Sequence, residues 1–249
     1  MDCETYIMAI DVGTQSVRAV VFNCEGQEIA NERVLNDPYY SLEPGWAEVP
    51  ADDFWKNVCL VTNRVCKKLG EDINKINACS ITANRDNIIP LDNDGNYIRD
   101  WITWVDQRRV PESVKDAHNQ VKGKNKIIHT FGKSFFNMLP NRSKFNWFKY
   151  HEKETYEKAY KYLTIGGLIT YKFTEKYHDS VGMQVGVLPF NVEKLDWYDL
   201  DIVYEIIGVR RDQLPKLFHA GQVMGYVTEK ASLESGLPVG LPIAAAGGD

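Results

Sequence analysis

The sequence predicts an α/β domain that opens with three antiparallel strands, continues with a helix and a buried strand, and carries a helical insertion. Two observations carry this prediction. The chain begins with three short apolar or alternating segments separated by turns, and an amphipathic segment is then followed by a continuous apolar run. With 249 residues, 44% apolar and 25% charged, the chain can bury one large core or two small ones.

The first three strands are expected where apolar segments alternate with turn residues. The segments are TYIMAID (5–11), VRAVVF (17–22) and EIANERVL (28–35), and the turns between them are VGTQS and NCEGQ. Short turns of this kind connect antiparallel neighbours. A three-stranded antiparallel meander follows.

A helix is expected next, over residues 51–70, because apolar side chains recur at helical spacing and Gly70 can end the helix. Residues 76–83 then have the apolar composition of a buried parallel strand. Residues 87–102 are expected to form a hairpin-like excursion that turns at Asp94-Gly95. The predicted apolar face of the helix consists of Trp55, Val58, Val61, Val65 and Leu69.

The remainder of the chain is predicted to be mostly helical. Residues 110–176 mix aromatic and charged side chains in a helical texture, and residues 195–209 are expected to form another helix ending near Gly208. The segment PIAAAGG (242–248) is expected to be the last strand. One α/β unit with a helical insertion is the simplest organisation.

Charge and hydropathy exclude two classes of partner. The formal net charge is −5, and lysine and arginine are interleaved with acids, so no basic surface for nucleic acid is expected. No window approaches the roughly 20 apolar residues that cross a bilayer, and the amino terminus has an acid where a secretion signal has positive charge. We therefore expect no membrane partner and a cytoplasmic location.

The turn DVGTQSVR is a candidate anion site. It carries hydroxyls, backbone N–H groups, an arginine and a carboxylate, which together suit phosphate with a divalent cation. An ordinary hairpin turn is an equal alternative, and the segment is neither a P-loop nor a dinucleotide fingerprint because no helix follows the glycine. The residues concerned are Asp11, Gly13, Thr14, Gln15, Ser16 and Arg18.

A second group of polar residues follows the next two predicted strands. Arg85 and Asp86 come just after the buried strand, and Trp104 and Asp106 come just after the following one. An adjacent arginine and aspartate offer donors and acceptors to a polyhydroxylated ligand, and an indole can cover its C–H face. The alternative is a surface ion pair and a core tryptophan.

Seven segments in order along the chain resemble the FGGY carbohydrate kinases, relatives of glycerol kinase and xylulokinase. This resemblance implies a ribonuclease-H-like, actin-type ATPase fold. It also implies an ATP-dependent kinase that phosphorylates a sugar or polyol. The segments are AIDVGTQSVRAVVFNCEGQEI, EPGWAEVPADDFW, ITANRDNIIPLDNDGNYIRDWITWVDQRR, SKFNWFKYHEKETYEKA, LDWYDLDIVYEIIGVRRDQLPKL, GYVTEKASLESGLPVGLPI and the terminal GGD.

The resemblance also implies roles for individual residues. Asp11 matches the acid that helps to hold Mg²⁺, and the loop with Gly13, Thr14, Gln15 and Arg18 matches the first contact with ATP phosphates. Three side chains match sugar or polyol contacts. Asp249 matches the carboxylate that contacts the attacking hydroxyl and accepts its proton. The three sugar contacts are Arg85, Asp86 and Trp104.

The family has two domains of similar size, and residues 1–249 match the first, sugar-binding one. We therefore expect the nucleotide-binding second domain to be absent from this chain, and the isolated chain to bind sugar but transfer little phosphate. Glycerol kinases have Arg-Glu where this chain has Arg85-Asp86, and xylulokinases have another pair, so neither glycerol nor xylulose is favoured. A non-catalytic actin-like module, acting as a sugar sensor or ATPase switch, is the alternative function. A homodimer of the full-length form stays open.

Overall fold

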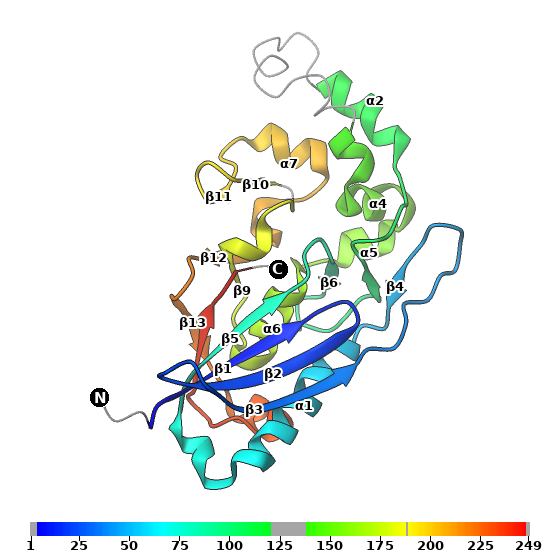
Figure 1. The fold of residues 1–249 in the computed structure, drawn as a ribbon. Helices are drawn as coiled ribbons and strands as arrows, with labels where there is room; N and C mark the ends of the chain where they lie inside the picture. The colour runs from blue at the N-terminus through cyan, green and yellow to red at the C-terminus, as the bar shows by residue number, and fades with distance from the viewer. Residues whose placement is uncertain (1–3, 121–137, 188, 248–249) are drawn as a thin grey trace.

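The computed structural model describes residues 4–120, 138–187 and 189–247 (Figure 1). The predicted meander is confirmed: β1 and β2 are antiparallel, as are β2 and β3. Asp11 on β1 lies opposite Arg18 on β2. The bounds of the strands are Tyr6–Val12 (β1), Ser16–Asn23 (β2) and Glu28–Leu35 (β3).

The meander belongs to a six-stranded sheet with the order β13-β14-β5-β1-β2-β3. The predicted buried strand is β5 (Ile76–Ala83), which runs parallel to β1, and β14 (Pro242–Ala245) runs parallel to β5. β13 (Val223–Tyr226) pairs antiparallel with β14. The carboxyl ends of β1, β5 and β14 therefore meet at one edge of the sheet.

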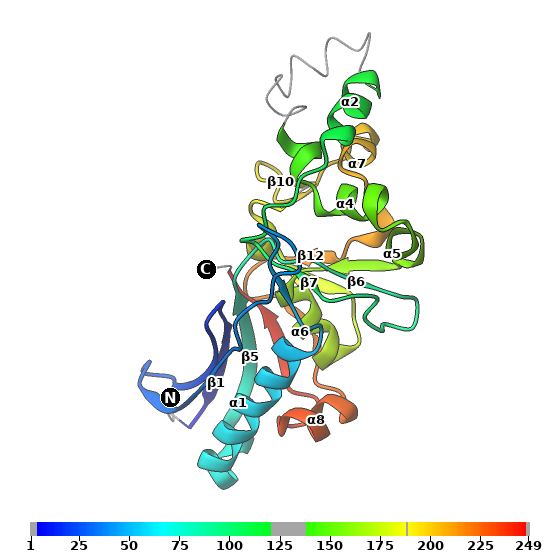
Figure 2. The same cartoon turned by 90° about the vertical axis from the view of Figure 1, so that its right-hand side faces the viewer.

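Two helices, α1 and α6, pack on one face of this sheet, and a third, α8, packs on them (Figure 2). The predicted first helix is α1 (Asp53–Leu69), which packs on β2 and β3 and ends at Gly70 with φ 58°. α6 (Ile165–Thr174) packs beside it, and the rings of Trp55 and Phe173 meet edge to face at 5.0 Å. α8 (Glu229–Ser235) contacts both helices. Alternate strand residues such as Met8, Ile10 and Val12 are buried under these helices and form the first core.

A second hydrophobic core lies in the part of the chain that follows β5. Its buried residues include Phe148, Tyr162, Trp197 and Ile207. The predicted helical texture of residues 110–176 is confirmed for the described helices, with one correction: β8 (Lys161–Leu163) lies among them and pairs with β6. The elements are β6 (Ile89–Leu91), α2 (Pro111–Gln120), α4 (Lys144–His151), α5 (Lys153–Lys158) and α7 (Asp201–Ile207).

The helix predicted over residues 195–209 begins later than expected. Only α7 is helical, and Gly208 ends it as predicted, with φ 81°. The preceding residues form a small hairpin in which β10 (Phe190–Asn191) pairs with β11 (Asp196–Trp197). Leu195 has φ 53° in the turn, which a right-handed helix does not allow.

The predicted excursion after β5 is confirmed as a turn around Gly95, with an isolated bridge between Leu91 and Tyr97. Gly95 has φ 79°, and a Cβ atom there would lie within 2.0 Å of the Tyr171 hydroxyl, so only glycine fits. The remaining short elements are β4 (Glu48–Val49), β7 (Trp101–Ile102), β9 (His178–Ser180), β12 (Lys216–Phe218), η1 (Gly70–Lys75), η2 (Val181–Gln184) and η3 (Arg211–Gln213).

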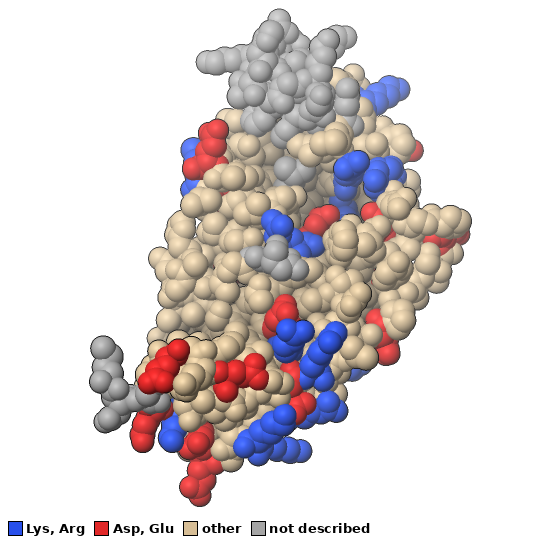
Figure 3. Space-filling view, in the orientation of Figure 1, with Lys and Arg blue, Asp and Glu red and all other residues tan. Residues whose placement is uncertain are grey.

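The distribution of charged side chains on the surface and the apolarity of the helices can be compared with the sequence analysis. On the face shown in Figure 3, lysine and arginine side chains lie among acidic ones and form no continuous basic field. Within the described ranges, no helix combines the length and apolarity needed to span a bilayer.

Candidate functional site

Polar residues at the ends of several strands line one open hollow of about 540 Å³, here called the polar hollow. Thr14 follows β1, Arg85 and Asp86 follow β5, and Trp104 follows β7. Four residues predicted from the sequence therefore meet in one place. The complete lining is Thr14, Asn84, Arg85, Asp86, Trp104, Val185 and Gly186.

The Arg85-Asp86 pair is fixed from the other side of the hollow. Arg85 donates from Nη1 to the carbonyl oxygen of Val185 at 3.0 Å. Asp86 has φ 58°, an uncommon conformation for a residue other than glycine, and its side chain is 55% exposed. Its carboxylate forms an ion pair with Lys144 Nζ at 2.9 Å. Both side chains are therefore oriented before any ligand binds.

Lys144 is a residue of this site that the sequence reasoning missed. Its side chain is only 8% exposed, and Nζ also donates to the backbone carbonyl of Asp86. Burial lowers the pKa of Lys144, and the Asp86 carboxylate opposes that shift. The signal in the sequence is weak: a lysine between Ser143, which caps α4, and the buried Phe145.

Trp104 forms part of the wall of the hollow. Its side chain is among the exposed large hydrophobic ones, with 51% of the residue accessible. The indole Nε1 donates to Thr14 Oγ1 at 3.2 Å, and the backbone N–H donates to Asn87 Oδ1 at 3.1 Å. The indole is thus held in an exposed position that a core tryptophan would not occupy.

Buried charges fix the loop that carries Trp104. Asp106 accepts from the backbone N–H of Ala47 at 2.7 Å and from Arg108 Nε at 2.8 Å. Arg108 in turn bonds Glu48 at 2.6 Å and lies over the Trp46 ring at 4.1 Å. Burial alone would raise the pKa of Glu48, but hydrogen bonds from its arginine partners bring it below the ordinary value. The loop after β7 is therefore rigid.

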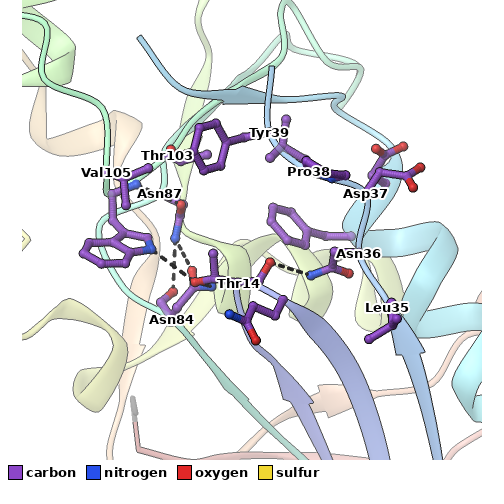
Figure 4. A pocket seen from close by; sticks show the side chains of 15 residues that line it. Thr14, Leu35, Asn36, Asp37, Pro38, Tyr39, Asn84, Asn87, Thr103 and Val105 are labelled. Atoms are coloured by element: carbon purple, nitrogen blue, oxygen red, sulfur yellow. Dashed lines mark hydrogen bonds between the residues drawn. The ribbon is translucent and has the colours of Figure 1, made fainter. Parts of the chain in front are cut away.

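A second hollow of about 370 Å³ lies beside the polar hollow and shares Thr14, Asn84 and Trp104 with it. Figure 4 shows Leu35, Pro38 and Tyr39 on the far side of this hollow from Asn84. Gln15 lines it, so the structure places Gln15 beside the predicted ligand site but outside the polar hollow.

The other predicted residues lie outside both hollows or beyond the described part of the chain. Gly13 makes the turn after β1, where its N–H donates to Ser16 O at 3.0 Å. Asp11 is half-buried and Arg18 is exposed, and the two are directly opposite on β1 and β2. Asp249 lies outside the described residues.

The family's sequence model, described as the amino-terminal domain of the FGGY family of carbohydrate kinases, matches residues 6–249. The chain belongs to this family. It is 26% identical over 243 residues to a glycerol kinase of Thermococcus gammatolerans, covering 95% of this chain and 47% of that protein. It is 28% identical over 260 residues to an autoinducer-2 kinase of Escherichia coli, covering 100% of this chain and 46% of that one. The chain thus spans about half the length of these curated relatives.

Solved structures of sugar kinases have the same fold. A xylulose kinase from Rhodospirillum rubrum matches with a TM-score of 0.82 at 20% identity, covering 98% of this chain and 48% of that one. A glycerol kinase from Plasmodium falciparum, solved with ADP, matches with a TM-score of 0.77 at 20% identity, again covering 98% and 48%. The predicted ribonuclease-H-like, actin-type fold is confirmed for this FGGY domain.

Asp11 can serve as a magnesium ligand only together with ligands that the described residues do not supply. No group of three or more acidic, histidine or cysteine side chains within the described ranges could hold a metal by itself. Mg²⁺ is usually bound through one or two carboxylates, with substrate phosphates and water completing the shell. A half-buried carboxylate at the end of β1, next to the Gly13 turn, suits such a shared site.

The end of β14 in this FGGY domain is held by two hydroxyl groups. Thr82 Oγ1 donates to the carbonyl of Gly247 at 3.0 Å, and Ser180 Oγ donates to the carbonyl of Ala246. Ser180 follows Asp179, a fully buried acid that accepts from Gln184 Nε2 at 2.7 Å. The backbone is therefore fixed on both sides up to Gly247, two residues before Asp249.

Proposed function

We propose that residues 1–249 are the sugar-binding, amino-terminal domain of an ATP-dependent kinase that phosphorylates a hydroxyl of a small sugar or polyol. The observation that carries the proposal is the convergence of Thr14, Arg85, Asp86 and Trp104 on one polar hollow. Family membership supports the reaction type. Because the chain spans about half of its relatives, the remaining nucleotide contacts would come from a second domain.

The polar hollow suits a polyhydroxylated ligand. Arg85 supplies donors, and the carboxylate of Asp86 supplies acceptors while its ion pair with Lys144 holds it in place. The exposed indole of Trp104 can cover the C–H face of a sugar. Donors, acceptors and an aromatic face are the groups that fix a small carbohydrate in one orientation.

The loop after β1 would hold the phosphates. Thr14 and Gln15 lie next to the hollow, and Arg18 is exposed on β2 beside Asp11. These groups could bind the phosphates of ATP, and Asp11 would hold the Mg²⁺ that accompanies them. Bound Mg²⁺ would neutralise charge on the phosphate oxygens.

Asp249 would act as the proton acceptor. Phosphoryl transfer depends mainly on positioning and charge stabilisation, so a carboxylate near the attacking hydroxyl orients it and takes its proton late. The backbone is held by hydrogen bonds up to Gly247, and this would position the Asp249 carboxylate near the hydroxyl. An ATP-consuming enzyme of this type would act in the cytoplasm.

A phosphorylation screen tests the proposal. The longest form of the gene product would be incubated with ATP, Mg²⁺ and a panel of polyols, pentuloses and hexonates, and ADP release would be measured. We expect release with one class of these compounds only. Sugar binding without transfer would instead favour the non-catalytic sensor, and neither binding nor transfer would contradict both.

A further inference from the structure

Four side chains beside the polar hollow form a closed ring of hydrogen bonds, here called the polar ring. Asn84 Nδ2 donates to Thr14 Oγ1 at 3.1 Å, and Asn84 Oδ1 accepts from Asn87 Nδ2. Asn87 Oδ1 accepts from the backbone N–H of Trp104, whose indole N–H returns to Thr14 Oγ1. Figure 4 shows Thr14, Asn84 and Asn87 side by side with these bonds dashed. The ring closes through the ends of β1, β5 and β7.

Neither asparagine faces solvent as an ordinary surface amide does. Asn87 is 1% exposed and Asn84 is 8% exposed. Asn84 also donates its backbone N–H to Val12 O at 3.1 Å, and Asn87 Nδ2 approaches the carbonyl of Arg85 at 3.1 Å. The pair therefore encloses the Arg85-Asp86 turn and fixes its position relative to β1. Buried amides with satisfied donors and acceptors hold a single geometry.

Within the ring, the Thr14 hydroxyl accepts two hydrogen bonds and can still donate one. A hydroxyl has two acceptor lone pairs and one proton to donate. Asn84 and Trp104 use both lone pairs, so only the proton remains available. Thr14 is exposed at the boundary between the two hollows, and its proton can therefore be given to an acceptor that enters there.

We propose that Asn84 and Asn87 are positioning residues that aim the Thr14 hydroxyl, as a donor, at the transferring phosphoryl group and tie it to the indole over the sugar. This inference rests on the proposed kinase function. It makes one network responsible for both halves of the site: the phosphate end through Thr14 and the polyol end through Trp104. A polyol that contacts the indole of Trp104 therefore contacts the same ring that orients the Thr14 hydroxyl toward the phosphoryl group.

Kinetics of variants in the longest form of the protein test this proposal, with a substrate found in the screen. Thr14→Val removes the hydroxyl at constant shape and should lower kcat about 10- to 100-fold, the worth of one hydrogen bond to a charged group. Asn84→Ala should lower kcat about 5- to 10-fold, because the hydroxyl loses one of the two bonds that orient it. The double variant should be no slower than Thr14→Val alone. Effects that multiply in the double variant would overturn the proposal.

The matched control is Asn63→Ala. Asn63 is also a partly buried asparagine that joins two elements, with Nδ2 donating to Glu234 O at 2.7 Å, but it lies between α1 and α8, away from the hollow. Its kcat should stay at the parent value. Thermal melts show whether each variant folds. If Asn84→Ala does not fold, Trp104→Phe is used in its place. That change removes the other donor to Thr14, and Trp104 is exposed.

A second readout needs no activity. In ¹⁵N spectra of the 249-residue chain, the indole N–H signal of Trp104, assigned with Trp104→Phe, should shift in Thr14→Val and Asn84→Ala but not in Asn63→Ala. An indole signal unmoved by Thr14→Val would overturn the ring. A responsive indole in a protein that phosphorylates nothing would instead overturn the kinase proposal and the phosphate role of Thr14, while the ring itself would stand.

Discussion

The two sides of the polar hollow come from two different parts of the fold. On one side, Thr14, Asn84 and Arg85 follow strands of the six-stranded sheet, whose register fixes their backbone. On the other side, Val185 and Gly186 line the hollow, the carbonyl of Val185 accepts from Arg85, and the buried Lys144 contacts Asp86. The sheet side thus supplies Thr14, Arg85 and Asp86, the loop after β7 supplies Trp104, and the other side holds Arg85 and Asp86 in place. Substitutions on the two sides should therefore have different consequences.

The largest effect is expected for Asp249→Asn. The change keeps the size of the side chain and removes the proton acceptor, so transfer should fall by about 10²- to 10⁴-fold with little change in sugar affinity. Rates of the longest form, with exposed Asp94→Asn as the control, check this. An unimpaired Asp249→Asn enzyme would remove that carboxylate from the mechanism.

The Asp86–Lys144 pair should respond asymmetrically because only the lysine is buried. Asp86→Ala leaves an uncompensated buried cation and should lower the free energy of unfolding by about 3 to 5 kcal/mol. Lys144→Met leaves a carboxylate that water can reach and should cost less than about 1 kcal/mol. Urea denaturation of the 249-residue chain measures both. Equal costs would show that the difference in burial between Lys144 and Asp86 does not control the stability of the pair.

Asp179 is a fully buried acid, and its raised pKa predicts that the stability of the fold depends on pH. Burial raises its pKa to about 6, although Thr164 and Gln184 donate to it. The unfolded chain, with an ordinary pKa of about 3.9, loses this proton first, so stability should fall as pH rises from about 4 to 6, by about 3 kcal/mol. Denaturation curves across this window should show the loss, and Asp179→Asn should flatten it. A pH-independent parent protein would contradict the buried acid.

The sequence predicted the sheet side of the site well. Asp11 lies near the end of β1, and Thr14 and Arg85 follow apolar strands that can be recognised locally; strands in parallel register bring their carboxyl ends together. Whether the matched residues perform the roles that the family implies stays a prediction. Arg85, Asp86 and Trp104, which the sequence analysis grouped as possible sugar contacts, line one hollow, whereas the presence of Thr14 in the same hollow was not predicted.

The supporting side could not be predicted in this way. Lys144 meets Asp86 across 58 residues of sequence, and no local pattern encodes that pairing. Asn84 and Asn87 look like ordinary turn residues until the ring through Thr14 is seen. The late start of α7 depends on Leu195 adopting a positive φ that its residue type disfavours. Tertiary contacts decided each of these features.

The central claim is that the strand-end hollow binds a polyhydroxylated ligand through Arg85, and calorimetric titration tests it most directly. The 249-residue chain and its Arg85→Ala variant would be titrated with the compound that the screen identifies, and Arg64→Ala, an exposed arginine on α1, would be the control. Loss of a donor to a buried ligand should weaken binding by about 1 to 3 kcal/mol, whereas the control should bind as the parent does. Equal affinity of the parent and Arg85→Ala would contradict the account.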